Sequence, residues 1–200
     1  MSGTWIVLGS SPLARTAYQQ AKARNDGAAV ITANRGLQIE NDPDFYFLSD
    51  SKACELWAED GRQATKRGRT KTVTLRRDPH AMKQRKVDDF TLLVKEGPPF
   101  ESFQLSGLWC VEFAVQVGHA SQVVLCGMDG YDRNKGVGDY FAGSTRIPEF
   151  EGAGKDLTDS VVEPLTNRIV SKYPSVTFQC WGQPCYQVNR PNWVIVPLSL

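Results

Sequence analysis

Histidine is scarce in this sequence, and its two copies, His80 and His119, have no partner at the spacing that a metal site requires. Cys180 and Cys185 lack the second half of a zinc site. There is no Gly-x-Ser-x-Gly turn, and the sequence does not assemble a Ser-His-Asp triad. The residues therefore give no sign of a metal centre or of a nucleophilic triad.

Other signatures are missing as well. Gly9-Ser10-Ser11-Pro12 is neither a Walker loop nor a Gly-x-Gly-x-x-Gly fingerprint. No window approaches the roughly 18 apolar residues of a membrane span, and no positively charged lead marks a signal peptide. The five cysteines are an odd number without the spacing of a disulfide framework. These absences predict a soluble, cytoplasmic protein in a reducing compartment.

The composition is that of one globular domain, residues 1–200, because 41% of the residues are hydrophobic and 22% charged. The charge is unevenly distributed. Residues 62–86 contain ten Lys or Arg and one acid, whereas the rest contains 13 bases and 21 acids. We describe 62–90 as a basic insert and predict that it binds a polyanion. The cations of this set are Arg67, Arg69, Arg76, Arg77, Lys83 and Arg85.

An equally plain interpretation is that this basic insert is a solvated loop without a partner. It contains no aromatic residue for stacking on bases, so any contact with nucleic acid would be made mainly with phosphates.

Short apolar runs without alternation predict strands that are buried on both faces of a mostly parallel sheet. We expect a Rossmann-like α/β fold with flanking helices and a glycine-rich lid loop at 132–155. Ser11 is a candidate cap for a helix over 13–25. The expected strands are 4–8, 28–33, 45–48, 72–75, 90–94, 122–126, 176–181 and, at an edge, 193–196, and the other expected helices are 51–57, 108–117 and 156–173.

Small polar residues follow the apolar runs, and parallel sheets bind ligands at the carboxyl ends of their strands. The candidates are Gly9, Ser10, Ser11, Asn34, Ser49 and Asp50. Each has an ordinary alternative: a tight turn at Gly9, a left-handed conformation at Asn34, and helix capping at Asp50.

Asp129 follows the strand predicted at 122–126, where a carboxylate must be hydrogen-bonded or solvated. Tyr131 and Tyr140 flank the glycine-rich loop, and their phenols suit either a phosphate or a structural anchor.

The order of these motifs resembles that of the bacterial lipo-oligosaccharide sialyltransferases. Residues 6–13, Ile-Val-Leu-Gly-Ser-Ser-Pro-Leu, resemble their Gly-Asn-Gly-Pro-Ser turn, and the run ending in Asn34 resembles their second strand. Ser106-Gly107-Leu108 and the later Gly-Met-Asp-Gly-Tyr, 127–131, are similar to their Ser/Thr-Gly helix and Gly-Ile-Asp-x-Tyr strand end. The archaeal hydroxymethylpterin pyrophosphokinase-like proteins share this skeleton. The likeness covers 4–60 and 104–181.

This resemblance implies a nucleotide-activated donor, typically a cytidine monophosphate sugar, and no obligatory metal. It places Gly9, Ser10, Ser11, Asn34, Ser49 and Asp50 at the nucleotide or sugar, Ser106 and Gly107 at phosphate, and Asp129 at ribose hydroxyls. Tyr131 and Tyr140 would stabilise the departing phosphate.

The sialyltransferases use a histidine before the last helix as general base, and residues 149–156 contain none. Glu149, Glu151 and Asp156 are the candidates to replace it.

Three hypotheses remain open at this point. The first is a glycosyltransferase with a hydroxyl acceptor, for example a polyanion such as modified phage DNA facing the basic insert. The second is transfer of phosphate or diphosphate from a nucleoside triphosphate, which needs magnesium, with Asp50 and Asp129 as candidate ligands. The third is a non-enzymatic nucleic-acid-binding or virion-associated protein.

Overall fold

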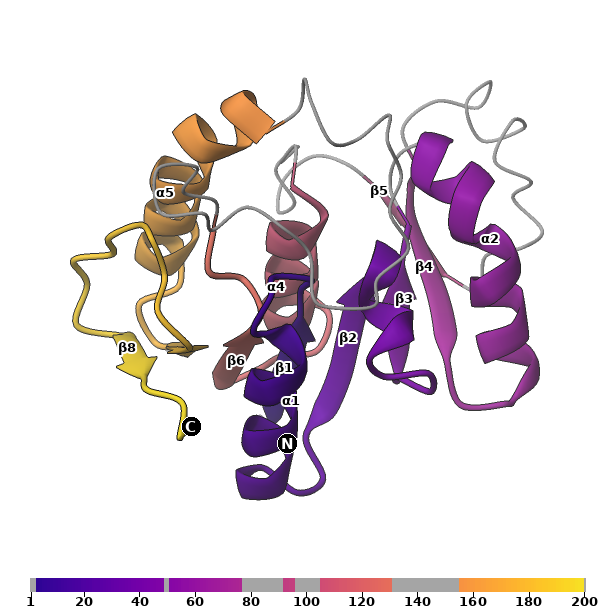
Figure 1. Ribbon diagram of the computed structural model, residues 1–200, viewed down its shortest axis with the longest axis horizontal. Coiled ribbons are helices and arrows are strands. Elements are labelled where there is room, and N and C mark those ends of the chain that lie inside the picture. The colour runs from indigo at the N-terminus through magenta and orange to yellow at the C-terminus, as the bar shows by residue number, and fades with distance from the viewer. Residues whose placement is uncertain (1–2, 49–50, 77–91, 96–104, 131–154, 200) are drawn as a thin grey trace.

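The computed structural model describes residues 3–48, 51–76, 92–95, 105–130 and 155–199. Within these ranges the chain forms one sheet of eight strands flanked by four helices (Figure 1). The strands are β1 (Thr4–Leu8), β2 (Ala29–Ala33), β3 (Phe45–Phe47), β4 (Lys71–Arg76), β5 (Leu92–Lys95), β6 (Gln122–Cys126), β7 (Thr177–Trp181) and β8 (Trp193–Val196). The helices are α1 (Ala14–Arg24), α2 (Ser51–Lys66), α4 (Ser106–Gln116), α5 (Lys155–Lys172) and the short 3-10 helix η1 (Asn34–Gln38).

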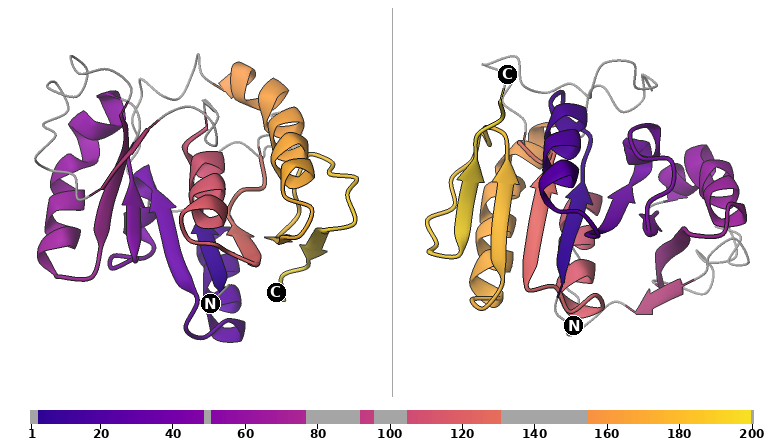
Figure 2. Two further views of the ribbon diagram at one scale, coloured as in Figure 1. Left: turned by 180° about the vertical axis from the view of Figure 1, so that it is seen from behind. Right: turned by 90° about the horizontal axis from the view of Figure 1, so that it is seen from below.

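The strand order is β5-β4-β3-β2-β1-β6-β7-β8, and every neighbouring pair is parallel. The view from below shows β8 at one edge of the sheet (Figure 2, right). The chain builds outward from β1 through β2 to β5, then returns to place β6 on the other side of β1. This reversal is a topological switch point, where open α/β sheets bind their ligands.

Two layers of helices cover the sheet, as the front and back views show (Figure 1; Figure 2, left). On one face Val7, Val123 and Phe178 pack in a core with residues of α4 and α5. On the other face Ile6, Leu8 and Val124 pack against α1, and Tyr46 packs against α2. The central strands are therefore buried on both sides, which explains why their sequences are continuous apolar runs.

The structure confirms the α/β class and the parallel sheet, and it corrects several details. Ser11 is not the cap of α1, since the helix begins at Ala14 and its N-cap residue is Leu13. Helix α2 extends to Lys66, well beyond the short helix predicted over 51–57. The first part of the basic insert therefore consists of the end of α2 and strand β4, which is an integral part of the sheet.

None of the helices in the described ranges is long and apolar enough to cross a bilayer.

Candidate functional site

The ends of β2, β1 and β6 lie side by side at the carboxyl edge of the sheet. Asn34 directly follows β2, Gly9 directly follows β1, and Asp129 comes three residues after β6. Neighbouring strands are about 4.8 Å apart, so the strands that lead to Asn34 and Asp129 are separated by about 10 Å. The fold thus brings these predicted site residues to one edge, at the switch point.

The turn after β1 is fastened to the turn after β6. The amide of Gly9 donates to the carbonyl of Cys126 at 2.7 Å, and the amide of Ser11 donates to the carbonyl of Gly127 at 3.1 Å. A Cβ at Gly9 would collide with the Gly127 carbonyl, so the close approach of the two turns requires glycine there. These two amides are consequently satisfied inside the protein, and a phosphate at this turn must be held by other groups.

Ser11 and Asp129 form the polar centre of this edge. The Ser11 hydroxyl donates a hydrogen bond to Oδ2 of Asp129. Asp129 is only 3% exposed, and its Oδ1 is buried without a hydrogen-bond partner in the described part of the chain. Burial raises the pKa of the Asp129 carboxyl above its usual range, and the Ser11 hydrogen bond opposes that shift. The unused acceptor capacity of this buried oxygen is one that a hydroxyl or amine donor would satisfy.

The segment that follows β7 covers this carboxyl. A Cβ at Gly182 would lie 2.5 Å from Oδ1 of Asp129, and the φ of Gly182 is +137°. The Cys185 amide donates to the backbone carbonyl of Asp129 at 2.8 Å, and the Tyr186 hydroxyl donates to the carbonyl of Met128 at 2.8 Å. Sequence reasoning missed this segment, although Gly182 directly follows a predicted strand, as Gly9 does.

The N-terminus of α4 reaches the same edge. A Cβ at Gly107 would lie 3.0 Å from Cε of Met128, which places the start of α4 beside the turn after β6. The N-cap residue is Leu105, which offers no side-chain cap, and the first turn has no acidic residue. The first amides of any helix lack intrahelical acceptors, so this end of α4 presents a partial positive charge to the site.

Asn34 has the left-handed conformation that was its ordinary alternative, with φ +50°. The Tyr46 hydroxyl donates to its backbone carbonyl at 2.9 Å. Its side-chain Oδ1 is buried and has no partner in the described residues. The structure therefore shows the turn conformation of Asn34, and contact of its side chain with a nucleotide stays a prediction.

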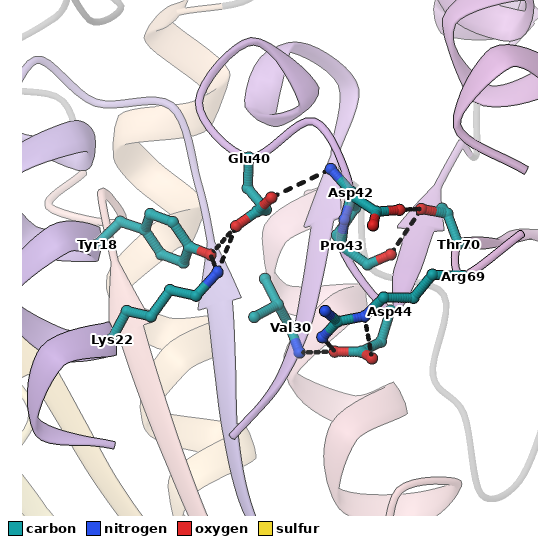
Figure 3. Close-up of polar contacts among 9 residues, drawn as sticks. All are labelled: Tyr18, Lys22, Val30, Glu40, Asp42, Pro43, Asp44, Arg69 and Thr70. Carbon is teal, nitrogen blue, oxygen red and sulfur yellow. Dashed lines mark hydrogen bonds and ion pairs between the residues drawn. The ribbon is translucent and has the colours of Figure 1, made fainter. Parts of the chain in front are cut away.

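The segment after η1 is anchored on α1 (Figure 3). Glu40 accepts hydrogen bonds from the hydroxyl of Tyr18 and from the ammonium of Lys22, the latter at 2.6 Å. Burial raises the pKa of Glu40, but the hydrogen bonds from Lys22 and Tyr18 outweigh it and leave the pKa below its usual value. This network fixes the chain between Asn34 and β3.

Three of the cations predicted to bind a polyanion, Arg67, Arg69 and Arg76, lie in the described ranges, and they do not cluster near Asp129. Arg69 lies before β4, at the amino edge, and its guanidinium pairs with Asp44 at 3.0 Å (Figure 3). Arg67 donates to the carbonyl of Asn41 in the same region. Arg76 is the last residue of the six-residue strand β4 and therefore lies about 20 Å from Arg69, at the carboxyl edge. Polyanion binding by this set stays a prediction.

Several predicted residues lie outside the described ranges: Ser49, Asp50, Arg77, Lys83, Arg85, Tyr131, Tyr140, Glu149 and Glu151. Asp156 lies in the first turn of α5, where the structure gives the backbone. Ser10 lies in the turn between Gly9 and Ser11, and Ser106 is the first residue of α4. Among the described residues no group of three His, Cys, Asp or Glu is placed to hold a metal ion.

Comparison with protein-family models, curated proteins and solved structures finds no match for this chain. The structural class of the protein therefore follows from its strand order alone. Six neighbouring strands of the sheet follow the Rossmann-like order 3-2-1-4-5-6 when β6, β7 and β8 are counted as the fourth, fifth and sixth strands. Strands β4 and β5 extend the sheet beyond β3. The protein is an α/β protein with an all-parallel sheet and a polar, glycine-lined edge at its switch point.

Proposed function

We propose that this protein is a glycosyltransferase that binds a nucleotide-activated sugar at the carboxyl ends of β1 and β6. The observation that carries the proposal is the Asp129 carboxyl, which is almost fully buried at the switch point with one oxygen bound by Ser11 and the other without a partner among the described residues. Burying such a group without a partner for one oxygen is costly, and its place at the switch point of the sheet favours a ligand role.

The chemistry of Asp129 suits the sugar hydroxyls of a nucleotide. A carboxylate accepts hydrogen bonds at both oxygens, and Ser11 binds Oδ2, so the acceptor capacity of the buried Oδ1 is unused among the described residues. The Ser11 bond also fixes the plane of the carboxyl. A ribose bound here would span the turns after β1 and β6, which is the usual position of a nucleotide in this fold class.

Two helix N-termini favour the phosphate of the same ligand. Both α1 and α4 begin at the carboxyl edge, and neither has a side-chain cap at its N-cap residue. Helix α4 begins with Ser106 and Gly107, and Met128 packs beside Gly107, so an anion at this helix start would be held by the first backbone amides. Because Gly9 and Ser11 use their amides internally, we assign the phosphate to the start of α4 rather than to the turn after β1.

The resemblance to the sialyltransferases supplies the transfer step of the proposal. In it Tyr131 and Tyr140 donate hydrogen bonds to the departing phosphate, and Glu149 or Asp156 accepts the proton of the acceptor hydroxyl. The sugar carbon exchanges its bond to the phosphate oxygen for a bond to the acceptor oxygen, and no metal is required in this scheme.

Calorimetric titration with cytidine, uridine, adenosine and guanosine monophosphates, each with and without magnesium, tests the proposal. We expect one nucleotide to bind without metal and Asp129→Asn to weaken it by about ten- to a hundredfold, since a hydrogen bond to a buried charge contributes about 1.5–3 kcal/mol. Asp44→Asn, the same substitution at the amino edge, is the control and should bind normally.

Binding of a nucleoside triphosphate that requires magnesium would replace this proposal with phosphate or diphosphate transfer. Failure of every nucleotide to bind would overturn both enzymatic hypotheses.

A further inference from the structure

The β7–β8 connection contributes to the candidate site in a way that neither the motifs nor the resemblance indicated. Its first residue, Gly182, donates its amide to Val196 at 3.1 Å and thereby continues the parallel pairing past the end of β7. At this point the chain adopts φ +137°, a conformation that side chains rarely tolerate. A Cβ at this residue would lie 2.5 Å from Oδ1 and 3.4 Å from Cγ of Asp129, so the Asp129 carboxyl occupies the place of a side chain at residue 182.

The rest of the segment clamps the turn that carries Asp129. The amide and the thiol of Cys185 both donate to the backbone carbonyl of Asp129, at 2.8 and 3.0 Å. The Tyr186 hydroxyl donates to the carbonyl of Met128, and the Tyr186 side chain is 8% exposed. A Cβ at Gly130 would lie 2.9 Å from the sulfur of Cys185, so the two turns are in close contact.

We propose that the segment Gly182–Tyr186 is a positioning element for Asp129, in which Gly182 provides the space that the carboxyl needs in order to lie against Ser11. The segment's consequence for ligand binding rests on the proposed function, whereas its effect on the carboxyl itself does not. Gly182 and Tyr186 act through Asp129, so they are positioning residues rather than catalytic ones.

The titration of the Asp129 carboxyl can report on its position, because the groups around it do not titrate in the same pH range. The Asp129 carboxyl accepts a hydrogen bond from Ser11 and interacts electrostatically with Cys126 on β6, Cys180 on β7 and Tyr186, while Cys185 binds the backbone carbonyl of Asp129. Burial raises the pKa of Cys180 to about 12 and raises the pKa values of Cys126 and Tyr186 as well. These three groups are therefore neutral at pH 3–8, where a carboxyl titrates.

A double-mutant cycle between Gly182→Ala and Asp129→Ala, read by denaturant unfolding, tests the contact. The new methyl collides with Oδ1 only while Asp129 is present, whereas the backbone strain at residue 182 is the same in both backgrounds. We expect Gly182→Ala to raise the unfolding equilibrium constant at least about fivefold more with Asp129 than with alanine at residue 129. Gly27→Ala, also at positive φ but with nothing near its Cβ, is the control and should be additive with Asp129→Ala.

The second readout is the carboxyl titration of Asp129 by ¹³C NMR, assigned by its loss in Asp129→Asn. We expect Gly182→Ala to lower the midpoint, because a displaced carboxyl regains solvent. If Gly182→Ala does not fold, Tyr186→Phe, which removes the hydroxyl that donates to Met128, should lower the midpoint in the same direction. Additivity within about twofold in the cycle, or an unchanged midpoint, overturns the proposal.

The nucleotide titration then separates this inference from the proposed function. If the wild type binds a nucleotide, Gly182→Ala should weaken it about tenfold, and an unchanged affinity would overturn the role in binding. If the wild type binds none, the proposed function fails, while the cycle and the NMR titration still decide whether the segment positions Asp129.

Discussion

Replacing Ser11 with alanine tests how the site holds its carboxyl. The substitution removes the hydroxyl that binds Oδ2 of Asp129 and leaves the rest of the turn in place, since the Ser11 amide still donates to Gly127. Both carboxyl oxygens then lack a partner in the described structure, and Asp129 is 3% exposed. We expect Ser11→Ala to lower the free energy of unfolding by about 2 kcal/mol at pH 7, within the range for hydrogen bonds to buried charges.

The cost of Ser11→Ala should depend on pH with a definite sign. Burial raises the folded-state pKa of Asp129 above the ordinary value of 3.8, so folding favours the protonated carboxyl. The stability that this group contributes is fully present below its unfolded pKa and is lost as the pH rises through the folded pKa. Ser11 lowers that folded pKa, so its removal extends the loss to higher pH. At pH 3 we therefore expect the cost to fall to about 1 kcal/mol, the value for a neutral hydrogen bond.

Urea unfolding of the wild type, Ser11→Ala and Asp129→Asn between pH 3 and 8 provides the measurement. Ser10→Ala, one residue away in the same turn, is the control and should stay within about 0.5 kcal/mol of the wild type. Asp129→Asn should flatten the pH dependence. A cost of Ser11→Ala that does not change with pH, or that grows as the pH falls, would refute the argument that the hydroxyl stabilises a buried carboxylate.

Three further predictions follow from other contacts. Glu112 of α4 is fully buried and pairs with Lys172 of α5 at 2.9 Å. In urea unfolding at pH 7, Lys172→Met should lower the free energy of unfolding by about 3 kcal/mol and Glu112→Gln by about 1 kcal/mol, because only the first leaves a buried charge without its partner. A larger loss for Glu112→Gln would contradict this prediction. A Cβ at Gly118 would collide with the ring of Trp5, so Gly118→Ala should lower stability by about 1–3 kcal/mol, and a neutral effect in thermal unfolding would refute this. If the basic insert binds a polyanion, the affinity for duplex DNA should fall steeply between 50 and 200 mM salt, and a flat profile would exclude that partner.

The sequence predicted the fold best in the strands whose burial requires apolar residues. The runs at 4–8 and 122–126 are mostly apolar on both faces because helices cover both sides of the sheet, and the strands predicted at 4–8, 122–126 and 176–181 were correct to within a residue. Because the carboxyl ends of parallel strands share an edge, the proximity of Gly9 to the turn bearing Asp129 also followed from the pattern.

Local signals misled where a tertiary contact competes with them. Ser11 has the ideal side chain for a helix cap, but the buried Asp129 binds its hydroxyl instead, and α1 starts three residues later. The cations Arg67 and Arg69 belong to a basic run in the sequence, yet carbonyl and carboxylate groups of residues 41–44 bind them at the amino edge. The role of Gly182 depends on the pairing of β7 with β8, which no local pattern specifies.

A crystal structure of the protein soaked with a panel of nucleoside monophosphates tests the central claim most directly. The account predicts one nucleotide between the ends of β1 and β6, with a ribose hydroxyl within hydrogen-bond distance of the Asp129 carboxyl and its phosphate at the start of α4. A nucleotide bound at another edge of the sheet, or an empty switch point with every member of the panel at saturating concentration, would contradict it.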